Sequence, residues 1–254
     1  MTTKGKTEIM SDTIRTLNNH VSVRTHTDEP VDDETVLTLL RAARRAPTSS
    51  NMQTYSFVVV RDLETRKKLK AFMVGNQDHV LTCQAFVAVC ADISRVIRAC
   101  ELHGKTLART LEISMVATVD AALVGMSLVT AAESIGLGAV RVGSIRTEPE
   151  EAARLLGLPE GVFVVFGVCI GWPDQRPPQR PRMSEEVIIH FERYNQDNLD
   201  KHLHEYDQAL AAYERSIGQE TKDTAWTSKM ADRFPKPARP GMRAALERLG
   251  FVFE

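Results

Sequence analysis

Apolar positions in the first two thirds of the chain follow two different spacings. Segments with apolar residues three or four positions apart, such as 32–45, are typical of helices that are buried on one side. Shorter runs rich in valine and other β-branched residues are typical of strands. The spacing predicts helices over 12–17, 32–45, 63–73, 111–135 and 148–156, and strands over 55–60, 85–90, 139–144 and 162–170. Strands and helices therefore alternate, and we expect an α+β core.

The segment 111–135 is apolar on nearly every side of the expected helix. Residues such as Met115 leave almost no polar face, so the helix has to be covered all round, by its own core or by another subunit. Asp120 and Glu133 bracket its longest uncharged stretch, residues 121–132. That stretch is shorter than the roughly 18 residues that a membrane-spanning helix needs, so we expect no membrane association.

The composition changes after Trp172. Residues 176–182 are rich in proline and arginine and cannot form the interior of a helix. The polar chain beyond them is expected to form helices over 200–217, 224–232 and 241–249. We therefore expect an α+β core over residues 1–172, and an extended linker with a C-terminal helical extension over residues 173–254 that packs on the core or on a partner.

Charge and cysteine content narrow the class of protein. The chain has 254 residues with 32 basic and 33 acidic side chains, and its formal net charge is −1. It lacks the excess of positive charge that drives general nucleic-acid binding. Its hydrophobic content of 43% supports a folded core. The four cysteines form no C-x-x-C pair and the N-terminus lacks an apolar secretion signal, so we expect a cytoplasmic location.

Several common functional motifs are absent or incomplete. Gly136 and Gly138 follow a helix rather than a strand, contrary to the order in a dinucleotide-binding fingerprint. His190, His202 and His204 lack a carboxylate or thiolate at ligand spacing, so we predict no metal site. The sequence contains no G-x-S-x-G elbow and no cysteine with an obvious basic activator, so it gives no sign of nucleophilic catalysis.

Two basic clusters are the strongest candidates for ligand binding. His20, Ser22 and Arg24 occupy alternate positions, so an extended backbone would direct all three to one side, an arrangement that suits a phosphate. In the second cluster proline keeps the chain extended between Arg180 and Arg182, which can reach one anion together. On local sequence alone, a solvated edge strand and a solvated basic linker remain the alternatives.

Two polar turns add to these clusters. Residues 48–53 carry hydroxyl and amide side chains, and residues 75–77 form a Gly-Asn-Gln turn. Together the four segments are suited to a phosphorylated ligand with a polar heteroaromatic ring.

The same segments resemble the nitroreductase superfamily. The similarity also includes residues 27–30, 46–53, 138–146 and 166–173, and it continues in the same order from about residue 20 to the C-terminus. Within the superfamily, the match is to the branch of oxygen-insensitive NADPH nitroreductases and NADPH-flavin oxidoreductases. As a combined pattern it is specific.

The resemblance implies an α+β homodimer, with a central mixed β-sheet flanked by helices and two FMN molecules in pockets at the subunit interface. The basic clusters would hold the phosphate and ribityl chain, the 48–53 loop would lie beside the ring, and Gln77 would meet the pyrimidine edge. The strand end 142–144 would cover one ring face, with a backbone N–H donating to flavin N5. The residues thus implied in FMN binding are His20, Ser22, Arg24, Thr48, Ser49, Asn51, Gln53, Gln77, Val142, Gly143, Ser144, Arg180 and Arg182.

The tail departs from the family at one position. Relatives that prefer NADPH have an arginine before a glycine that takes the 2′-phosphate, whereas Ile217 stands there in this chain. Arg215 and Lys222 are nearby cations suited to replace it, so we expect NADPH as reductant with NADH as an alternative. Arg239 matches a position that lines the acceptor pocket in relatives, and an exposed loop arginine is the other interpretation.

We therefore predict an FMN-dependent NAD(P)H oxidoreductase that works by ping-pong hydride transfer, first to bound FMN and then to a nitroaromatic, a quinone or free flavin. The cofactor carries out the chemistry, so we assign no catalytic side chain. Two alternatives remain: a flavin-binding protein without turnover, and a reductive dehalogenase of the same fold, a branch that usually lacks the polar helical tail.

Overall fold

The computed structural model describes residues 9–219 and 225–253. The chain divides into two compact units, Met1–Pro177 together with Gly241–Glu254, and Pro178–Pro240. The division expected at residue 172 differs from this one, because the end of the tail belongs to the first unit. Phe251 accounts for the difference: its side chain is fully buried and packs edge to face on Phe163, with 4.7 Å between the ring centroids.

The first unit is built on a four-stranded sheet in the order β1-β2-β4-β3. Its strands are β1 (Tyr55–Val60), β2 (Ala85–Asp92), β3 (Gly138–Val142) and β4 (Val162–Gly171). All neighbouring strands pair antiparallel, so the sheet is antiparallel rather than mixed. The central strands β2 and β4 are buried along their whole length, which explains their continuous apolar sequences.

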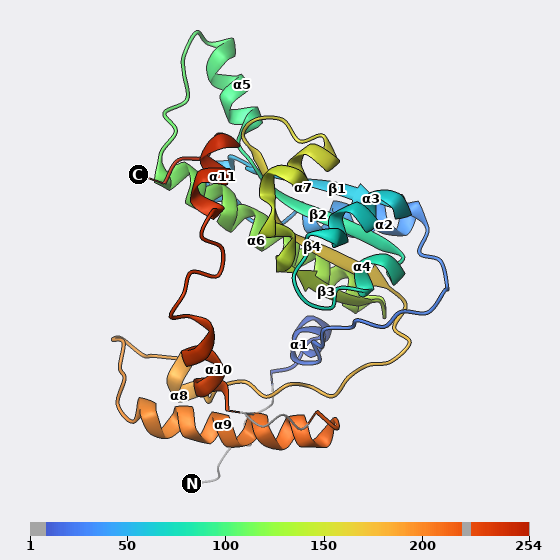
Figure 1. Ribbon diagram of the computed structural model, residues 1–254, viewed down its shortest axis with the longest axis vertical. Helices are drawn as coiled ribbons and strands as arrows, with labels where there is room; N and C mark the ends of the chain where they lie inside the picture. The colour runs from blue at the N-terminus through green and yellow to red at the C-terminus, as the bar shows by residue number, and fades with distance from the viewer. Residues whose placement is uncertain (1–8, 220–224, 254) are drawn as a thin grey trace. The chain divides into compact units, whose positions relative to one another are not determined.

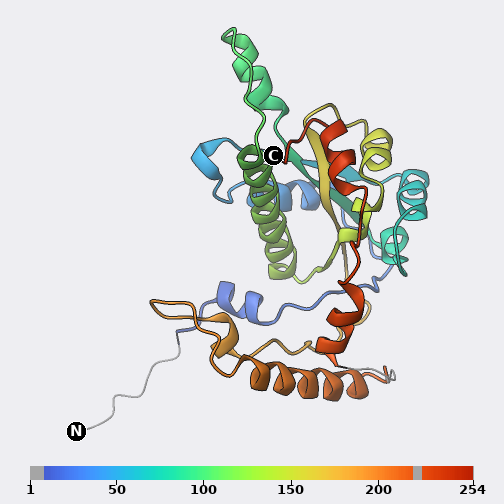
Figure 2. The ribbon, with the colours of Figure 1, turned by 60° about the vertical axis from the view of Figure 1, so that its left-hand side comes forward.

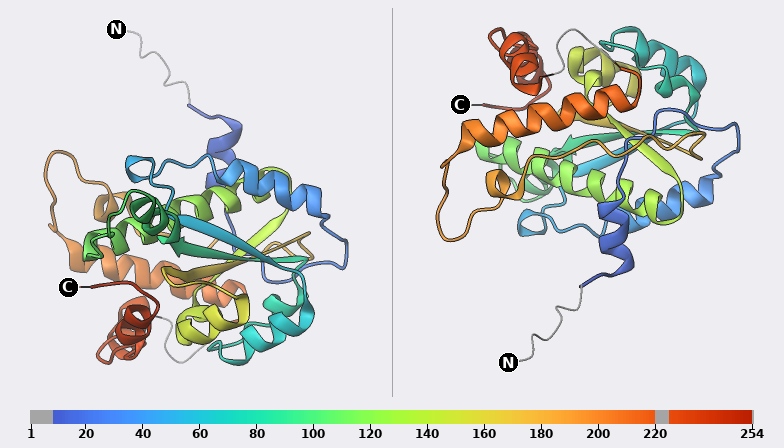
Figure 3. Two further views of the ribbon diagram at one scale, coloured as in Figure 1. Left: turned by 90° about the horizontal axis from the view of Figure 1, so that it is seen from above. Right: turned by 90° about the horizontal axis from the view of Figure 1, so that it is seen from below.

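Helices cover both faces of this sheet, as Figures 1 and 3 show. Two apolar clusters lie between the sheet and these helices, one on each face. One face carries α2 (Asp33–Ala43) and α6 (Leu111–Ser134), and the other carries α3 (Leu63–Ala71), α4 (His79–Thr82) and α7 (Pro149–Leu156). The unit also contains α1 (Asp12–Asn18), α5 (Ser94–Leu102) and α11 (Met242–Arg248). The predicted α+β fold is confirmed, although the spacing did not predict α4 and α5.

Short polar side chains set the starts of the main helices. Asp32 and Asp62 accept hydrogen bonds from the backbone N–H groups three residues later, at 2.6 Å and 2.7 Å. Thr110 caps α6 in the same way, with its hydroxyl 3.4 Å from the N–H of Ile113. Each bond satisfies a backbone donor that the first turn of a helix leaves without an intrahelical partner.

Helix α6, the long green helix in Figure 2, has two apolar sides. The side that faces the sheet is fully buried, for example at Ala121 and Leu128. The opposite side carries side chains that are 40% to 54% exposed, which we call the α6 stripe: Leu111, Met115, Val119, Leu123 and Met126. By length and composition α6 could cross a membrane, but the core helix of a folded domain passes the same test. Its packing on the sheet accounts for one apolar side and leaves the other unexplained.

The second unit contains α8 (Glu185–Ile188), α9 (Leu199–Ser216) and α10 (Trp226–Arg233). Tyr206 on α9 meets Trp226 on α10 edge to face, with 6.1 Å between the ring centroids. Glu214, which is buried, accepts hydrogen bonds at 2.7 Å and 3.0 Å from the ammonium group of Lys229. These contacts join α9 and α10 within the unit.

Gly125 allows α6 to lie close to the sheet. A Cβ atom at this position would be 2.3 Å from Cζ of Phe166 on β4, a buried ring. Real Cβ atoms essentially never approach another atom so closely. The glycine is therefore required by the packing rather than by the helix backbone.

We expect Gly125→Ala to lower the free energy of unfolding by about 1–3 kcal/mol through overpacking. The sign is informative, because alanine in a helix is otherwise about 1 kcal/mol more favourable than glycine. Denaturant-induced unfolding measures the change. Combining Gly125→Ala with Phe166→Leu should recover part of the lost unfolding free energy. If it recovers none, the destabilisation does not come from contact between the alanine Cβ and the Phe166 ring.

Candidate functional site

The segment with His20, Ser22 and Arg24 runs alongside β3. Ser22 forms an isolated parallel bridge with Ala139. The backbone N–H of the fully buried Val23 donates to the carbonyl oxygen of Ala139 at 3.1 Å. Arg24 is exposed, and its guanidinium reaches back to the Ser22 carbonyl oxygen at 3.3 Å. The segment is thus held against the core by Val23, while Arg24 remains at the surface.

His20 is oriented by Glu133, at the C-terminal end of α6. Its Nδ1 lies 2.6 Å from Oε1 of Glu133. Burial raises the pKa of the Glu133 carboxyl, and the bond to His20 acts in the opposite direction. A small cavity of about 270 Å³ lies next to this pair and is lined partly by Arg15 and Arg176. The sequence predicts a role for His20 but not its carboxylate partner.

His79 lies near Arg24 and His26, and we call these three residues the histidine cluster. Burial, assisted by the charges of Arg24 and His26, lowers the pKa of His79 to about 4. Burial also lowers the pKa of His26. Among the described residues, Nε2 of His79 and both ring nitrogens of His26 have no hydrogen-bond partner. The cluster therefore offers neutral ring nitrogens next to one permanent positive charge.

Gln77 lies two residues before His79, on the turn that begins with Gly75. The turn has a left-handed backbone at Gly75, with φ of 78°. The amide of Gln77 donates to the Val74 carbonyl oxygen at 3.0 Å, and Asn76 accepts from the N–H of Asp78 at 3.1 Å. Both bonds tie the turn to itself, so it leads into α4 in a defined conformation.

The 48–53 loop has an unusual backbone held by buried side chains. Ser50, Asn51 and Gln53 have positive φ values of 46°, 55° and 53°, which are uncommon for residues other than glycine. Asp120, on α6, accepts from the N–H of Ser49 at 3.1 Å. It also accepts from the N–H and hydroxyl of Thr54, at 3.1 Å and 2.8 Å.

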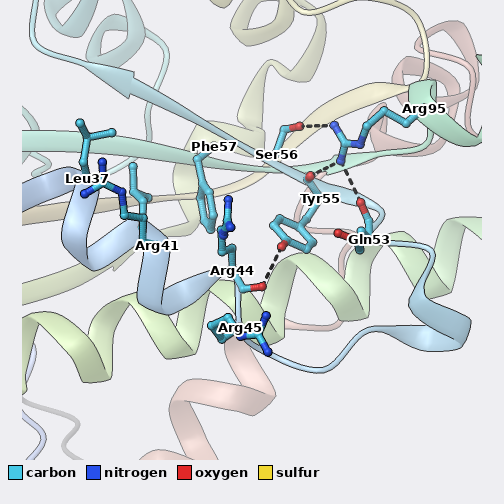
Figure 4. A pocket seen from close by; sticks show the side chains of 10 residues that line it. Leu37, Arg41, Arg44, Arg45, Gln53, Tyr55, Ser56, Phe57 and Arg95 are labelled. Atoms are coloured by element: carbon cyan, nitrogen blue, oxygen red, sulfur yellow. Dashed lines mark hydrogen bonds between the residues drawn. The ribbon is translucent and has the colours of Figure 1, made fainter.

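Arg95, on α5, holds the same loop from the other side, as Figure 4 shows. Its guanidinium donates to the carbonyl oxygens of Gln53, at 2.8 Å, and of Tyr55. It also donates to the carboxylate of Asp92, a buried residue, at 2.8 Å. A cavity of about 620 Å³ lies here, and its lining includes Arg41, Arg44, Arg45, Gln53, Tyr55, Phe57 and Arg95. Of the predicted site residues, only Gln53 lines it.

The predicted strand end at residues 142–144 is partly wrong. Strand β3 ends at Val142, and the chain continues as a short 3-10 helix over Gly143–Thr147. The hydroxyl oxygen of Ser144 is buried and has no partner among the described residues. A Cβ at Gly143 would be 3.5 Å from Nη2 of Arg146. The change of backbone direction directly follows the strand, where the resemblance expects the flavin ring.

The remaining predicted residues belong to the second unit. Arg180 lies over the ring of Tyr213, at 5.7 Å from its centroid, and Arg182 donates to the Arg180 carbonyl oxygen at 3.1 Å. Arg215 is exposed near the end of α9, and Arg239 is half-buried close to the end of the unit. Lys222 lies outside the described residues.

The residues present fit a phosphorylated flavin. The first unit supplies a cation at Arg24 and buried polar atoms without partners on His79 and Ser144. Buried polar groups normally have a hydrogen-bond partner, so these atoms are suited to bind a polar ligand. No group of three or more His, Cys, Asp or Glu side chains suited to a metal occurs in the described parts of the chain.

Sequence reasoning missed the residues that position this site. Asp120 and Glu133 are the clearest signals that were available, because a charged residue in an otherwise apolar helix is costly unless hydrogen-bonded. His26, His79 and Arg95 gave no comparable signal, since their neighbours come from distant segments.

Comparisons with known proteins agree with these observations. The model of the "Nitroreductase family" matches residues 17–172, and that of the "Nitroreductase family, C-terminal domain" matches residues 180–254. The chain is 36% identical to the FMN reductase [NAD(P)H] of Bacillus subtilis, over 96% of this chain and 100% of the relative. It is 34% identical to the NADPH-flavin oxidoreductase of Vibrio harveyi, over 96% of this chain and 99% of the relative.

Two solved structures show the same architecture over nearly the whole chain. The hypothetical oxidoreductase YcnD from Bacillus subtilis has a TM-score of 0.92 at 34% identity, covering 96% of this chain and 100% of its own. The NADPH:FMN oxidoreductase from Vibrio harveyi complexed with NAD+ has a TM-score of 0.85 at 33% identity, covering 95% and 99%.

Proposed function

The chain belongs to the nitroreductase family and is an FMN-dependent NAD(P)H oxidoreductase; we propose that it uses ping-pong hydride transfer with nitroaromatics, quinones or free flavin as acceptors. The structural observation that carries the proposal is the set of buried, unpartnered polar atoms on His79 and Ser144, in a unit that also holds Arg24 on a rigid segment. A site without a polar ligand would leave these atoms unsatisfied.

The phosphate and ribityl chain are assigned to His20, Ser22 and Arg24. For Arg180 and Arg182, the proposal that they also bind the phosphate rests on the family resemblance alone. Arg24 supplies a fixed charge and hydrogen-bond donors to the phosphate. Glu133 fixes the orientation of the His20 ring through Nδ1.

The flavin ring is assigned to the remaining predicted residues of the first unit. Gln77 supplies an amide to the pyrimidine edge, and the 48–53 loop supplies Thr48, Ser49, Asn51 and Gln53. A backbone N–H within residues 142–144 would donate to N5, and Gly143 would allow the backbone to approach closely. Bound FMN supplies the redox chemistry by accepting hydride from the nicotinamide and passing it to the acceptor. The role of the protein is therefore to bind and orient the flavin and the substrates and to shield them from water, and we assign no catalytic side chain.

The second unit is assigned to substrate binding. Arg215 and Lys222 are proposed to bind the 2′-phosphate of NADPH, and Arg239 to line the acceptor site. Since Arg215 is exposed and Ile217 replaces the arginine of NADPH-preferring relatives, we expect a modest preference for NADPH over NADH.

A reductive dehalogenase and a flavin carrier without turnover are less well supported. The family model of the C-terminal domain covers the helical tail, whereas proteins of the dehalogenase branch usually lack such a tail. A flavin carrier without turnover would need the same binding residues, so it is separated from the enzyme by kinetics alone.

We also propose that the protein is a cytoplasmic homodimer. The α6 stripe leaves an apolar surface on a helix whose other side already packs on the sheet. Obligate dimer interfaces resemble a core cut in half, which is the character of this surface. All four cysteines are free, in keeping with a reducing compartment.

The proposed activity predicts that NADPH bleaches the yellow flavin of the holoenzyme rapidly under anaerobic conditions. Stopped-flow absorbance and steady-state kinetics should give a kcat/KM for NADPH that is about tenfold higher than that for NADH. This is the effect of one favourable charge-assisted contact. The ratio of the two kcat/KM values should fall with added salt, because charge contacts on an exposed surface are screened over about 8 Å at physiological ionic strength. Persistent colour with both donors would identify a flavin carrier instead.

The proposed phosphate site predicts that Arg24→Ala weakens FMN binding by about 1.5–3 kcal/mol, the value of a hydrogen bond to a charged group. Riboflavin lacks the phosphate and should lose little affinity. Fluorescence titration of the apoprotein measures both constants, and Arg98→Ala, which removes an exposed arginine from α5, serves as the control. Equal weakening of the two flavins would show that Arg24 is structural.

The proposed dimer predicts that Val119→Asp, in the centre of the α6 stripe, shifts the protein to a monomer at micromolar concentration. An apolar interface cannot accommodate an unpaired charge without a large desolvation cost. Leu102→Asp is the matched control, because Leu102 is an exposed apolar residue on α5 outside the stripe. Light scattering decides the question, and a wild-type monomer that retains FMN would rule out the dimer.

A further inference from the structure

Asp120 is an exception on the buried side of α6. Asp120 is only 1% exposed, and its neighbours on that side, such as Ala121 and Val124, are fully buried and apolar. No salt bridge among the described residues pairs it with a cation. A carboxylate in such surroundings is unfavourable unless hydrogen bonds replace its lost hydration.

The replacing hydrogen bonds all come from the 48–53 loop and the residue that follows it. Oδ1 accepts from the N–H of Ser49 at 3.1 Å. Oδ2 accepts from the N–H of Thr54 at 3.1 Å and from its hydroxyl at 2.8 Å. Thr54 is itself fully buried, and its carbonyl oxygen accepts from the N–H of Asp92 on β2 at 3.0 Å. One side chain therefore joins both ends of the loop to α6.

The loop needs such support. Three of its residues other than glycine, Ser50, Asn51 and Gln53, have left-handed backbones, which side chains with a Cβ disfavour. The side chains of Ser49, Asn51 and Gln53 are exposed, so their own packing cannot maintain this conformation. The bonds to Asp120 compensate for the strain, and they leave the polar side chains directed outward on a fixed backbone.

We propose that Asp120 is a positioning residue for flavin binding: it holds the 48–53 loop in the conformation that presents its side chains to the isoalloxazine ring. This inference rests on the proposed function of the loop as part of the FMN site. A carboxylate is required because all three of its partners are donors, and only a carboxylate accepts at both oxygens. Asparagine would direct an amide donor toward a donor.

The test is Asp120→Asn, measured as flavin affinity of the apoprotein by fluorescence titration. We expect the dissociation constants of FMN and riboflavin to rise together, by about tenfold to a hundredfold, as for the loss of one hydrogen bond to a charged group. Equal losses are expected for a loop that contacts the ring, because both flavins have the ring, and the Ser114→Ala control separates this effect from general damage to α6. Arg24→Ala should instead affect FMN alone, so the two variants distinguish the ring part of the site from the phosphate part.

Ser114→Ala is the matched control for general damage to α6. Ser114 is also a buried polar residue on this helix, and its hydroxyl donates to the Val252 carbonyl oxygen at 2.7 Å, far from the loop in sequence. We expect it to lower the melting temperature without changing either dissociation constant. If Asp120→Asn behaves in the same way, its role is structural and the proposal is overturned.

Variants at Thr54 keep the proposal testable should Asp120→Asn fail to fold. Thr54→Val removes the hydroxyl donor with little change in shape and should weaken both flavins, whereas Thr54→Ser retains the hydroxyl and should restore binding. Unchanged affinity in Thr54→Val would overturn the inference. If wild-type apoprotein binds neither flavin, the proposed function itself fails; if Arg24→Ala weakens FMN but Asp120→Asn weakens nothing, only this inference fails.

Discussion

The structure depends on a helix that has no polar face. Helix α6 can be stable in water only if apolar surface covers it on all sides, because each exposed apolar side chain forgoes the free energy of leaving water. The sheet covers one side through closely packed residues, and Gly125 brings the helix near enough for Phe166 to lie against its backbone. The exposed stripe on the other side is apolar surface that the sheet does not cover.

Two carboxylates on α6, those of Asp120 and Glu133, each form hydrogen bonds with a distant segment of the chain. Asp120 is hydrogen-bonded by a loop that lies about seventy residues earlier in the chain, and Glu133 is bonded by His20, which is more distant still. Both contacts join a core element to a segment with exposed polar side chains. Hydrogen bonds to these two carboxylates thus hold the 48–53 loop and the His20 segment against α6.

Local pattern was sufficient for most elements of the first unit. The strands are apolar runs that contain valine, and helices such as α2 and α3 begin at aspartate caps, so local sequence and tertiary structure favour the same conformation. Strand pairing was not predictable in this way, because the antiparallel partners of β2 lie far apart in sequence. The return of residues 241–253 to the first unit likewise depends on the burial of Phe251, which no local spacing reveals. For the candidate site, the sequence motifs predicted the exposed residues. The residues that hold these segments by hydrogen bonds are seen only in the tertiary structure: Asp120, Glu133 and Arg95.

The number of residues in α6 also fixes the spacing between the 48–53 loop and the His20 segment. Asp120 and Glu133 are about 20 Å apart along its axis at about 1.5 Å per residue. Inserting or deleting one residue between them would change that length only slightly, but it would turn one carboxylate by about 100° relative to the other. One of them would then lose its partner. We infer that evolution and engineering can vary the length of the surface loops more freely than this stretch of helix, where the number of residues is as constrained as their identity.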